Sequence, residues 1–365
     1  MSTLTLDARW LSTGLGTYTL NLVRELRKCD EFHVRLLTLP EHRQRLSEYG
    51  YELLPVKASI YSAREQIEIA WAARGSKLLH VPHYNAPLMF RGSLVVTIHD
   101  LNHILDTTYR KNLKSLLYAQ PMLRAVAMRA DHIFTVSEYS KRQIMEHLGA
   151  DGEKITVVYN GLAPHFFPEP RAQAQIDTER CCSFVGPYVL FVGNLKPSKN
   201  VAGLLHAFAV LKSRLRLPHH LLLVGDDAAG RPSLTALARK LQLEDSAVFA
   251  GQLSEGPLRK AYCGADLTVL PSFEEGFGLP VLESMACGTP VACSRAASLP
   301  EIAGEAAEYF DPRDIDSIAA SMERVLQSND RWAELQRLGV ERASRFTPQR
   351  FAERHFAVYR QFLKE

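Results

Sequence analysis

Short apolar runs alternate with longer amphipathic stretches along almost the whole chain. Helical patterns such as 17–28, 200–216 and 279–287 lie between runs that have the length of strands. Unbroken apolar strands that alternate with helices are typical of parallel sheets covered on both faces, so the pattern predicts a doubly wound α/β fold. The predicted strands are 32–39, 78–82, 94–98, 132–136, 155–159, 188–192, 220–224, 247–250, 267–270 and 290–293.

One stretch of the chain interrupts this alternation. The stretch 164–187 holds several polar residues and no predicted strand, and it contains Pro164, Pro168, Pro170 and Pro187. This composition is typical of a linker. A length of 365 residues suits two domains. We therefore expect two Rossmann-like domains facing a cleft, at 1–165 and 187–347, joined by a linker at 166–186. The helix at 348–365 is rich in aromatic residues, so we expect it to pack against another part of the protein. The first domain is the candidate.

Composition narrows the function classes. The chain has 43 Lys and Arg against 40 Asp and Glu, which is too balanced for binding nucleic acid by bulk electrostatics. No run approaches the ~18 apolar residues that a membrane span needs. The first ten residues lack a signal-peptide pattern, which predicts a cytoplasmic protein. The six cysteines form no CxxC pair, so we expect buried free thiols.

The strongest chemical motif follows the predicted strand at 267–270. Gly276 and Gly278 let the backbone turn sharply and approach a ligand closely. Pro280 suits the first turn of a helix, where its missing N–H costs nothing. The N–H groups around Gly278 and Leu279 would then form a helix N-terminus that can hold a diphosphate.

Two carboxylates flank this turn. Glu275 lies in the predicted loop and Glu283 lies in the following helix, so both can face the carboxyl edge of the sheet. Carboxylates accept hydrogen bonds from vicinal hydroxyls, and two of them beside an anion site would suit a nucleotide sugar. The residues alone leave a second interpretation open, namely a solvated glutamate pair beside an ordinary glycine-rich turn.

The wider pattern favours the first interpretation. The stretch at 271–290 resembles the E-x7-E signature of the retaining glycosyltransferases of family 4, which have the GT-B fold and include mannosyltransferases. Four other stretches resemble motifs of this family in the family's order: 13–18, 97–100, 192–200 and 298–307. The resemblance implies transfer of a sugar from a nucleotide-sugar with retention of configuration, without a cofactor or an essential metal.

The resemblance also implies roles for single residues. Glu283 matches the glutamate that binds ribose, Glu275 the one that contacts the donor sugar, and Lys199 the cation that neutralises the diphosphate. Asn194 stands where many relatives carry a second basic residue, with Lys196 as a candidate substitute. The implied donor-binding set is Gly14, Gly16, Asn194, Lys199, Glu275, Gly276, Phe277, Gly278, Leu279 and Glu283.

The first domain contributes the remaining candidates. The resemblance makes Gly14 and Gly16 a loop that faces the diphosphate, although a tight turn alone also explains them. His99 follows a predicted strand, and the resemblance assigns it to the donor sugar or the reaction centre, with Asp100 toward the acceptor. A hydrogen-bonded core histidine is the alternative. The catalytic set that the resemblance implies is His99, Lys199 and Glu275.

Two apparent metal motifs have simpler explanations. Asp314 and Asp316 form a DxD pattern, but they open a predicted helix at 315–326, where an N-cap and a first-turn acid suit them. Four histidines lie near two strand ends without paired helical spacing, so we expect no zinc site. They are His80, His83, His99 and His103.

The overall hypothesis is a hexosyltransferase that takes GDP-mannose, or else a UDP-hexose, in polysaccharide or O-antigen-type biosynthesis. Its acceptor would be a glycan or a lipid-linked saccharide. The stretch 109–130 holds five basic residues and no acid, which fits either contact with the inner face of an anionic membrane or a solvated helix face. The alternatives are a GT-B nucleotide-sugar epimerase and a sugar-binding protein. A dinucleotide oxidoreductase is a weaker alternative, because no GxGxxG motif follows a first strand.

Overall fold

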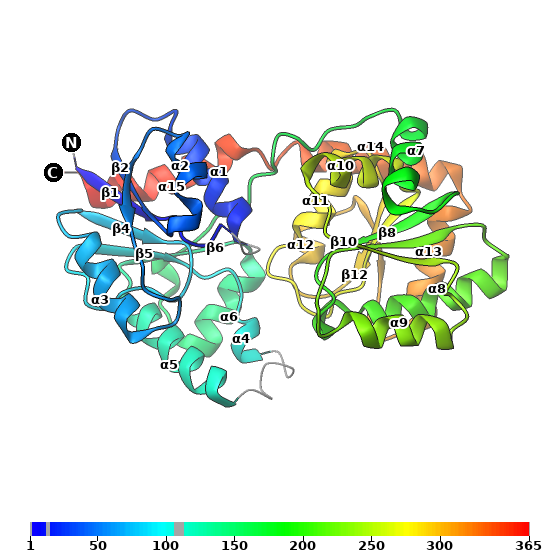
Figure 1. Cartoon of the computed structure of the whole chain (residues 1–365), viewed down its shortest axis with the longest axis horizontal. Coiled ribbons are helices and arrows are strands. Elements are labelled where there is room, and N and C mark those ends of the chain that lie inside the picture. The colour runs from blue at the N-terminus through cyan, green and yellow to red at the C-terminus, as the bar shows by residue number, and fades with distance from the viewer. Residues whose placement is uncertain (1, 12–14, 106–112, 365) are drawn as a thin grey trace. The chain divides into compact units, whose positions relative to one another are not determined.

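The computed structural model describes residues 2–11, 15–105 and 113–364. The chain forms two compact units (Figure 1). Unit 1 contains Met1–Ala163 and Phe346–Glu365, and unit 2 contains Pro164–Arg345. No helix within the described ranges has both the length and the apolar character that crossing a membrane requires.

Unit 1 is built on a seven-stranded sheet in which every pairing is parallel. The strand order is β3-β2-β1-β4-β5-β6-β7. The strands are β1 (Thr3–Asp7), β2 (His33–Thr38), β3 (Glu52–Pro55), β4 (Leu78–Val81), β5 (Ser93–Thr97), β6 (His132–Thr135) and β7 (Ile155–Val157). Its helices are α1 (Gly16–Leu26), α2 (Arg43–Ser47), α3 (Ala63–Ala72), α4 (Asn102–Leu105), α5 (Leu113–Arg129), α6 (Glu138–Leu148) and α15 (Pro348–Leu363), with 3-10 turns η1 (Pro40–His42) and η3 (Gly152–Lys154).

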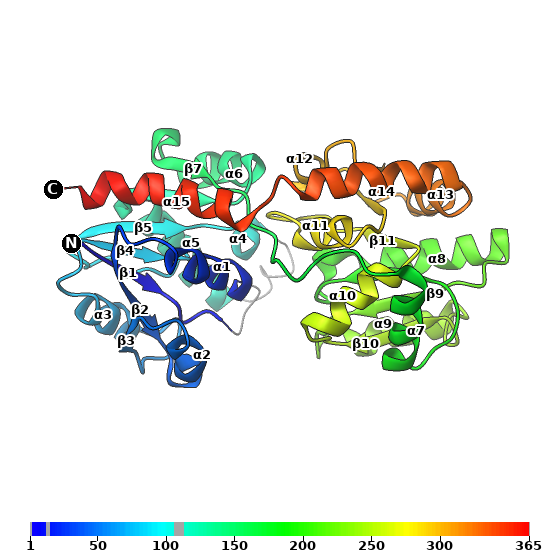
Figure 2. The ribbon, with the colours of Figure 1, turned by 90° about the horizontal axis from the view of Figure 1, so that it is seen from above.

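Helices cover both faces of this sheet. Side chains of α3, α5 and α6 share one core with β4, β5 and β6. The C-terminal helix α15 packs against α1, and Figures 1 and 2 show it returning to unit 1 after α14 of unit 2. Unit 1 therefore takes its first and last helices from opposite ends of the chain.

Unit 2 has a six-stranded parallel sheet in the order β10-β9-β8-β11-β12-β13. The strands are β8 (Tyr188–Val192), β9 (His220–Val224), β10 (Ala247–Gly251), β11 (Leu267–Leu270), β12 (Val291–Ser294) and β13 (Ala307–Phe310). The helices are α7 (Arg171–Cys182), α8 (Val201–Leu215), α9 (Arg231–Lys240), α10 (Glu255–Gly264), α11 (Leu279–Ala286), α12 (Leu299–Ala303), α13 (Ile315–Leu326) and α14 (Asn329–Ala343), with a 3-10 turn η4 (Pro197–Lys199). Its main core joins α8, α9, α13 and α14 to the sheet.

The doubly wound α/β fold is confirmed, but three strands escaped the sequence pattern. They are β1, β3 and β13. In β1, Thr5 and Asp7 are as buried as Leu4 and Leu6, because Thr5 bonds Ser76 and Asp7 bonds Arg9. A search for apolar runs therefore misses β1, because its buried polar side chains form hydrogen bonds inside the fold.

The expected linker at 166–186 is corrected by the structure, which folds most of it into helix α7 of unit 2. This helix packs on α10, and Asp177 forms an ion pair with Lys260 at 2.6 Å. Pro170 is the N-cap of this helix, and Pro187 directly precedes β8. The expectation of buried thiols also fails at Cys181, which is exposed on this helix, although Cys263 is buried.

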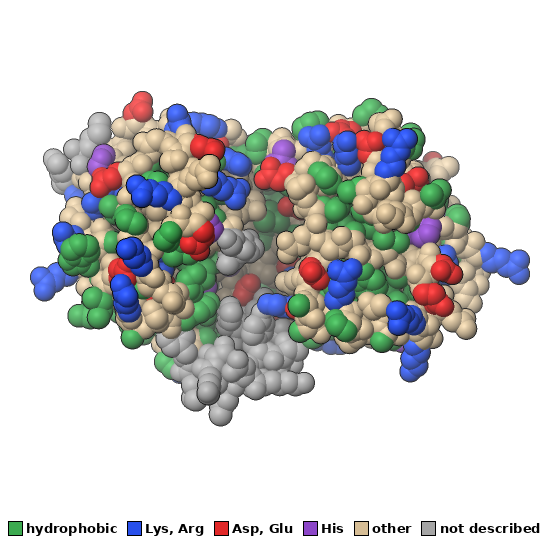
Figure 3. Space-filling model, in the orientation of Figure 1, with side chains coloured by type: hydrophobic (Ala, Val, Ile, Leu, Met, Phe, Trp, Pro, Cys, Tyr) green, Lys and Arg blue, Asp and Glu red, His purple; other side chains and the backbone are tan. Residues whose placement is uncertain are grey.

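The basic stretch at 109–130 corresponds in part to α5, since 109–112 lie outside the described residues. Arg129 donates to the carbonyl oxygen of Phe90 at 2.6 Å and pairs with Asp131 at 3.2 Å. At least one of the five basic side chains therefore ties the helix to its own unit. Basic and acidic side chains are interspersed over the face in Figure 3, which agrees with the small net charge.

A buried polar network attaches α15 to the sheet of unit 1. The Tyr18 hydroxyl lies 2.5 Å from His355 Nε2 and 2.8 Å from Thr97 Oγ1. His80 lies 2.8 Å from the same threonine and 2.5 Å from the Tyr359 hydroxyl. Burial lowers the pKa of His355 to about 3 and also lowers that of His80. Neutral imidazoles therefore hold the network together.

These histidines should make unit 1 acid-sensitive. Burial also lowers the pKa of His99 and of His132 to about 4. The unfolded chain takes up these protons near its ordinary pKa of ~6.5 while the folded unit resists them, so stability is lost as pH falls from about 6.5 toward 4. Each histidine contributes a slope of up to ~1.4 kcal/mol per pH unit.

Chemical denaturation at pH 7 and pH 5 measures this effect. Trp10 and Trp71 lie in unit 1 and Trp332 in unit 2, so the Trp332→Phe variant reports unit 1 by fluorescence. We expect its denaturation midpoint to fall at pH 5. An unchanged midpoint would contradict the assignment of neutral, buried histidines.

Candidate functional site

The candidate site of unit 2 lies where its strand order reverses. β8 and β11 pair in parallel, while the chain continues from β8 to β9 on one side and from β11 to β12 on the other. The loops that follow β8 and β11 therefore leave the same sheet edge in opposite directions. Ligands of open α/β sheets bind in the crevice that such a reversal creates.

A direct ion pair joins these two loops. Lys199 Nζ lies 2.5 Å from Glu275 Oε1, and the Ser272 hydroxyl donates to the same oxygen at 3.0 Å. The backbone N–H of Phe273 also donates to the carbonyl oxygen of Ser198 at 2.9 Å. Both charged side chains are largely buried, with 17% and 13% of their surface exposed. The structure thus brings together two residues that lie 76 positions apart.

The glycine-rich turn beside this pair has a strict steric requirement. Gly278 precedes α11 with φ +95°, a conformation that side-chain-bearing residues rarely adopt. A Cβ there would lie 2.6 Å from Leu299 Cδ2. Phe277 is buried and anchors the turn, whereas Leu279 is half-buried at the start of the helix. The turn therefore leads from Glu275, the partner of Lys199, into the start of α11 within four residues.

Glu283 lies within α11 and has a different environment from Glu275. The Tyr262 hydroxyl donates to Glu283 Oε2 at 2.7 Å. Burial raises the pKa of Glu283 to about 7, and the Tyr262 hydrogen bond opposes this rise. A bound ligand with hydroxyl donors would favour the ionised form of Glu283.

Sequence reasoning did not identify Tyr262 or Ser272. Ser272 stands three residues before Glu275, a spacing that allows a local hydrogen bond and provided a usable signal. Tyr262 comes from α10, and no pattern in the sequence indicates that this helix meets α11. Its role depends on tertiary packing alone.

The other expected residues of unit 2 occupy the loop after β8. Asn194 is exposed, and its Oδ1 accepts from the backbone N–H of Lys196 at 3.3 Å. It therefore shapes the turn that leads to Lys199. Gly276 is buried within the second loop.

Unit 1 holds the remaining candidates. Gly16 opens α1, and a Cβ there would lie 2.4 Å from the carbonyl oxygen of Leu11, so close packing requires glycine. Gly14 lies outside the described residues. His99 follows β5 and its Nε2 lies 3.2 Å from the Pro82 carbonyl oxygen. Since a carbonyl only accepts, Nε2 carries the proton, and the lowered pKa leaves Nδ1 as an acceptor.

The DxD pattern is confirmed as a helix cap. Asp314 Oδ1 accepts from the N–H of Asp316 at 2.9 Å and of Ser317 at 3.2 Å. Across the part of the chain that the structure describes, no three His, Cys, Asp or Glu side chains are grouped so as to hold a metal ion. The side chain of His103 lies outside the described residues.

Comparison with known proteins decides the family. The profile described as "Glycosyltransferase Family 4" matches residues 12–166, and the one described as "Glycosyl transferases group 1" matches residues 186–342. This chain belongs to glycosyltransferase family 4. The two matches fall on unit 1 and unit 2 respectively, in the order that the sequence motifs implied.

Relatives of this glycosyltransferase include O-antigen enzymes. The O-antigen chain mannosyltransferase B of Escherichia coli is 29% identical over 92% of both chains. The O-antigen chain mannosyltransferase RfbU of Salmonella typhimurium is 25% identical over 87% of this chain and 88% of its own. The structure of Anabaena HepE with UDP-glucose aligns with a TM-score of 0.81 at 17% identity, covering 99% of this chain and all of that one. It shows the shared GT-B fold.

A side chain at Gly278 should destabilise the glycosyltransferase more than one at a glycine whose surroundings leave room for a Cβ. Gly278→Ala adds a clash with Leu299 to the cost of a positive φ. The matched control is Gly288→Ala, with φ +78° and no atom closer than 3.5 Å to a Cβ. We expect Gly288→Ala to cost about 1–2 kcal/mol of unfolding free energy. Gly278→Ala should cost roughly 1 kcal/mol more, because overpacking adds to it. Equal losses in urea denaturation would contradict the close packing.

Proposed function

We propose that this glycosyltransferase moves a hexose from a nucleotide-sugar to a glycan or lipid-linked saccharide with retention of anomeric configuration. GDP-mannose is the first donor candidate and a UDP-hexose the second. The O-antigen mannosyltransferases among its relatives support a mannosyl donor. The reaction belongs in the cytoplasm, with peripheral contact to an anionic membrane when the acceptor is lipid-linked. Co-sedimentation with anionic and neutral vesicles tests that contact.

One observation carries the proposal: Lys199 and Glu275 meet at 2.5 Å beside the N-terminus of α11, where the strand order reverses. The ion pair keeps a cation and a carboxylate together in a partly buried place. A donor diphosphate would bind Lys199 and the N–H groups of α11, and Glu275 would then accept from sugar hydroxyls. Glu283, held by Tyr262, would bind the ribose hydroxyls.

The chemical step follows from where charge develops. The bond between the anomeric carbon and the diphosphate oxygen breaks, and the acceptor oxygen forms its bond on the same face. The acceptor proton passes to the departing phosphate, whose growing negative charge Lys199 stabilises. His99 contributes an unprotonated Nδ1 toward the donor sugar, because its Nε2–H is held by Pro82.

A donor panel tests the function. Purified protein is titrated with GDP-mannose, UDP-glucose and UDP-galactose, and slow hydrolysis of each is followed without acceptor. We expect one donor to bind and to hydrolyse, and anomer analysis of the transfer product to show retention. A panel in which no donor binds refutes the donor site, and conversion of the donor to its epimer indicates an epimerase instead.

Single substitutions test the two loops. Glu275→Gln and Lys199→Ala should each lower kcat by roughly 100-fold or more, since Glu275 orients the donor sugar and Lys199 stabilises the charge on the departing phosphate. Lys260→Ala is the matched control, because it also breaks a lysine–carboxylate pair of unit 2 at 2.6 Å. Circular dichroism checks that all three variants fold. Near-normal rates in both loop variants would contradict the proposed site.

Transfer should proceed without a metal ion, because Lys199 and the start of α11 supply the positive potential. EDTA at millimolar concentration should therefore leave the rate unchanged, and added Mg²⁺ or Mn²⁺ should not raise it. A rate lost in EDTA and restored by a divalent cation would overturn this part of the proposal.

A further inference from the structure

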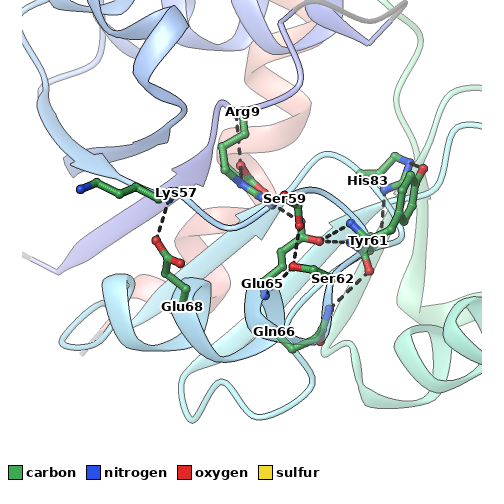
Figure 4. A network of polar contacts seen from close by, with 11 residues as sticks. Arg9, Lys57, Ser59, Tyr61, Ser62, Glu65, Gln66, Glu68 and His83 are labelled. Atoms are coloured by element: carbon green, nitrogen blue, oxygen red, sulfur yellow. Dashed lines mark hydrogen bonds and ion pairs between the residues drawn. The ribbon is translucent and has the colours of Figure 1, made fainter.

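A cluster of aromatic rings lies at the carboxyl edge of the unit 1 sheet, outside the residues assigned so far. Trp10 follows β1, Tyr61 follows β3, and His83 and Tyr84 follow β4. The rings of Trp10 and His83 stack with centroids 3.9 Å apart and 20° between planes. Tyr61 meets both rings edge-on, with centroids 5.9 Å away in each case. Figure 4 shows Tyr61 beside His83.

Three buried charged side chains, Asp7, Arg9 and Glu65, support this aromatic cluster. Arg9 donates through Nη1 to Glu65 Oε1 at 2.7 Å (Figure 4). Through Nε and Nη2 it also donates to the two oxygens of Asp7, at 2.8 and 2.7 Å. The side chains of all three residues have no exposed surface. Burial opposes the charge on Arg9, but the two carboxylates outweigh it and raise its pKa. Buried charges are costly unless paired, so each member of this set depends on the others.

The ionic set fixes the backbone of Tyr61. The second oxygen of Glu65 accepts from the Tyr61 N–H and from the Asn85 side-chain amide, both at 2.6 Å. Tyr61 has φ +65°, a left-handed conformation that is strained for a tyrosine. Ser62 then caps α3 by accepting from the Glu65 N–H at 3.2 Å. The start of α3, the Asn85 side chain and the buried carboxylate of Glu65 therefore determine the position of the exposed Tyr61 ring.

An ordinary surface loop does not need this arrangement. Tyr61 is 42% exposed, and backbone strain of this kind persists where the surrounding structure over-determines it, often at ligand sites. The more exposed Trp71 differs, since it lies on the regular helix α3 with Arg74 over its ring. Strain combined with exposure thus distinguishes Tyr61 from Trp71.

The position of the cluster connects it to the reaction. The carbonyl oxygen of Pro82, which accepts from His99 Nε2, belongs to the residue just before His83. β4 and β5 are neighbours in the sheet, so the aromatic cluster and His99 share one edge. A group bound on Tyr61 would therefore lie on the same edge of unit 1 as His99.

We propose that Tyr61, backed by Trp10 and His83, is a stacking surface for a pyranose ring of the saccharide acceptor. The C–H face of a sugar ring packs on the electron-rich face of an aromatic ring, while the hydroxyl groups at its rim remain available for hydrogen bonds. Arg9 and Glu65 act as positioning residues through the backbone of Tyr61. This inference rests on the proposed glycosyl transfer and names the part of unit 1 that selects its acceptor.

Three variants distinguish the effect of the Tyr61 ring from that of its strained backbone and from that of exposed aromatic rings in general. Tyr61→Gly removes the ring but accepts the positive φ without strain, and Tyr61→Phe keeps the ring without its hydroxyl. Trp71→Ala removes an exposed aromatic ring that the proposal does not use. With GDP-mannose as donor and octyl α-mannopyranoside as acceptor probe, Tyr61→Gly should raise the acceptor KM by about tenfold, the loss of one stacked ring.

Donor hydrolysis without acceptor should stay within about twofold in all three variants, because the cluster lies outside the donor loops. Tyr61→Phe and Trp71→Ala should keep the wild-type acceptor KM. An unchanged KM in Tyr61→Gly, or an equal rise in Trp71→Ala, would overturn the stacking surface while wild-type transfer upholds the function.

Direct binding covers the case in which the wild type turns over no donor. Saturation-transfer NMR with the same pyranoside should then still show contact in the wild type and a loss of signal in Tyr61→Gly. That result would refute the donor assignment and uphold the stacking surface. No signal in the wild type, or the same signal in Tyr61→Gly, would refute the surface itself.

Discussion

Parallel strand pairing is the constraint on which the whole protein depends. In a parallel sheet every strand ends at the same edge, so the loops after the strands gather there whatever their distance along the chain. In unit 2 this rule joins the loop after β8 to the loop after β11, and with them Lys199 to Glu275. In unit 1 it gathers the loops after β1, β3, β4 and β5, which carry Arg9, Tyr61, His83 and His99.

The two edges hold charge in different ways. In unit 2 the Lys199–Glu275 pair retains some exposure, so a ligand can compete for each partner. In unit 1 the charged side chains of Asp7, Arg9 and Glu65 are fully buried and paired with one another. They therefore support the structure rather than bind a ligand directly. Under the proposed function, the pair in unit 2 responds to the charged donor, and the set in unit 1 fixes the backbone that presents Tyr61.

The C-terminal helix explains how unit 1 is completed. α15 follows all of unit 2 in the sequence, yet its His355 and Tyr359 join Tyr18 and His80 in one buried network. Tyr18 also meets His99 edge-on, with ring centroids 4.8 Å apart. The last helix therefore supports the same edge of the sheet on which the candidate histidine lies, and neutral imidazoles make that support sensitive to acid.

The sequence by itself determined the α/β class, the main apolar strands, and the glycine-rich turn between Glu275 and Glu283. These depend on local patterns: period, glycine and proline placement, and motif order. The cap at Asp314 also follows from local sequence. The sequence could not reveal the buried polar strand β1, the helix α7 in place of a linker, or the hydrogen bond from the Tyr262 hydroxyl to Glu283.

Tertiary structure decided those features because each joins groups that no sequence spacing relates. Asp7 is compatible with a buried strand only because Arg9 and Glu65 complete its ionic set, and Glu65 comes from a helix 56 residues beyond Arg9. The same holds for Tyr61, whose strained backbone is stable only while that distant carboxylate accepts its N–H. Local propensity sets the elements, and long-range pairing of buried polar groups decides which side chains the fold presents.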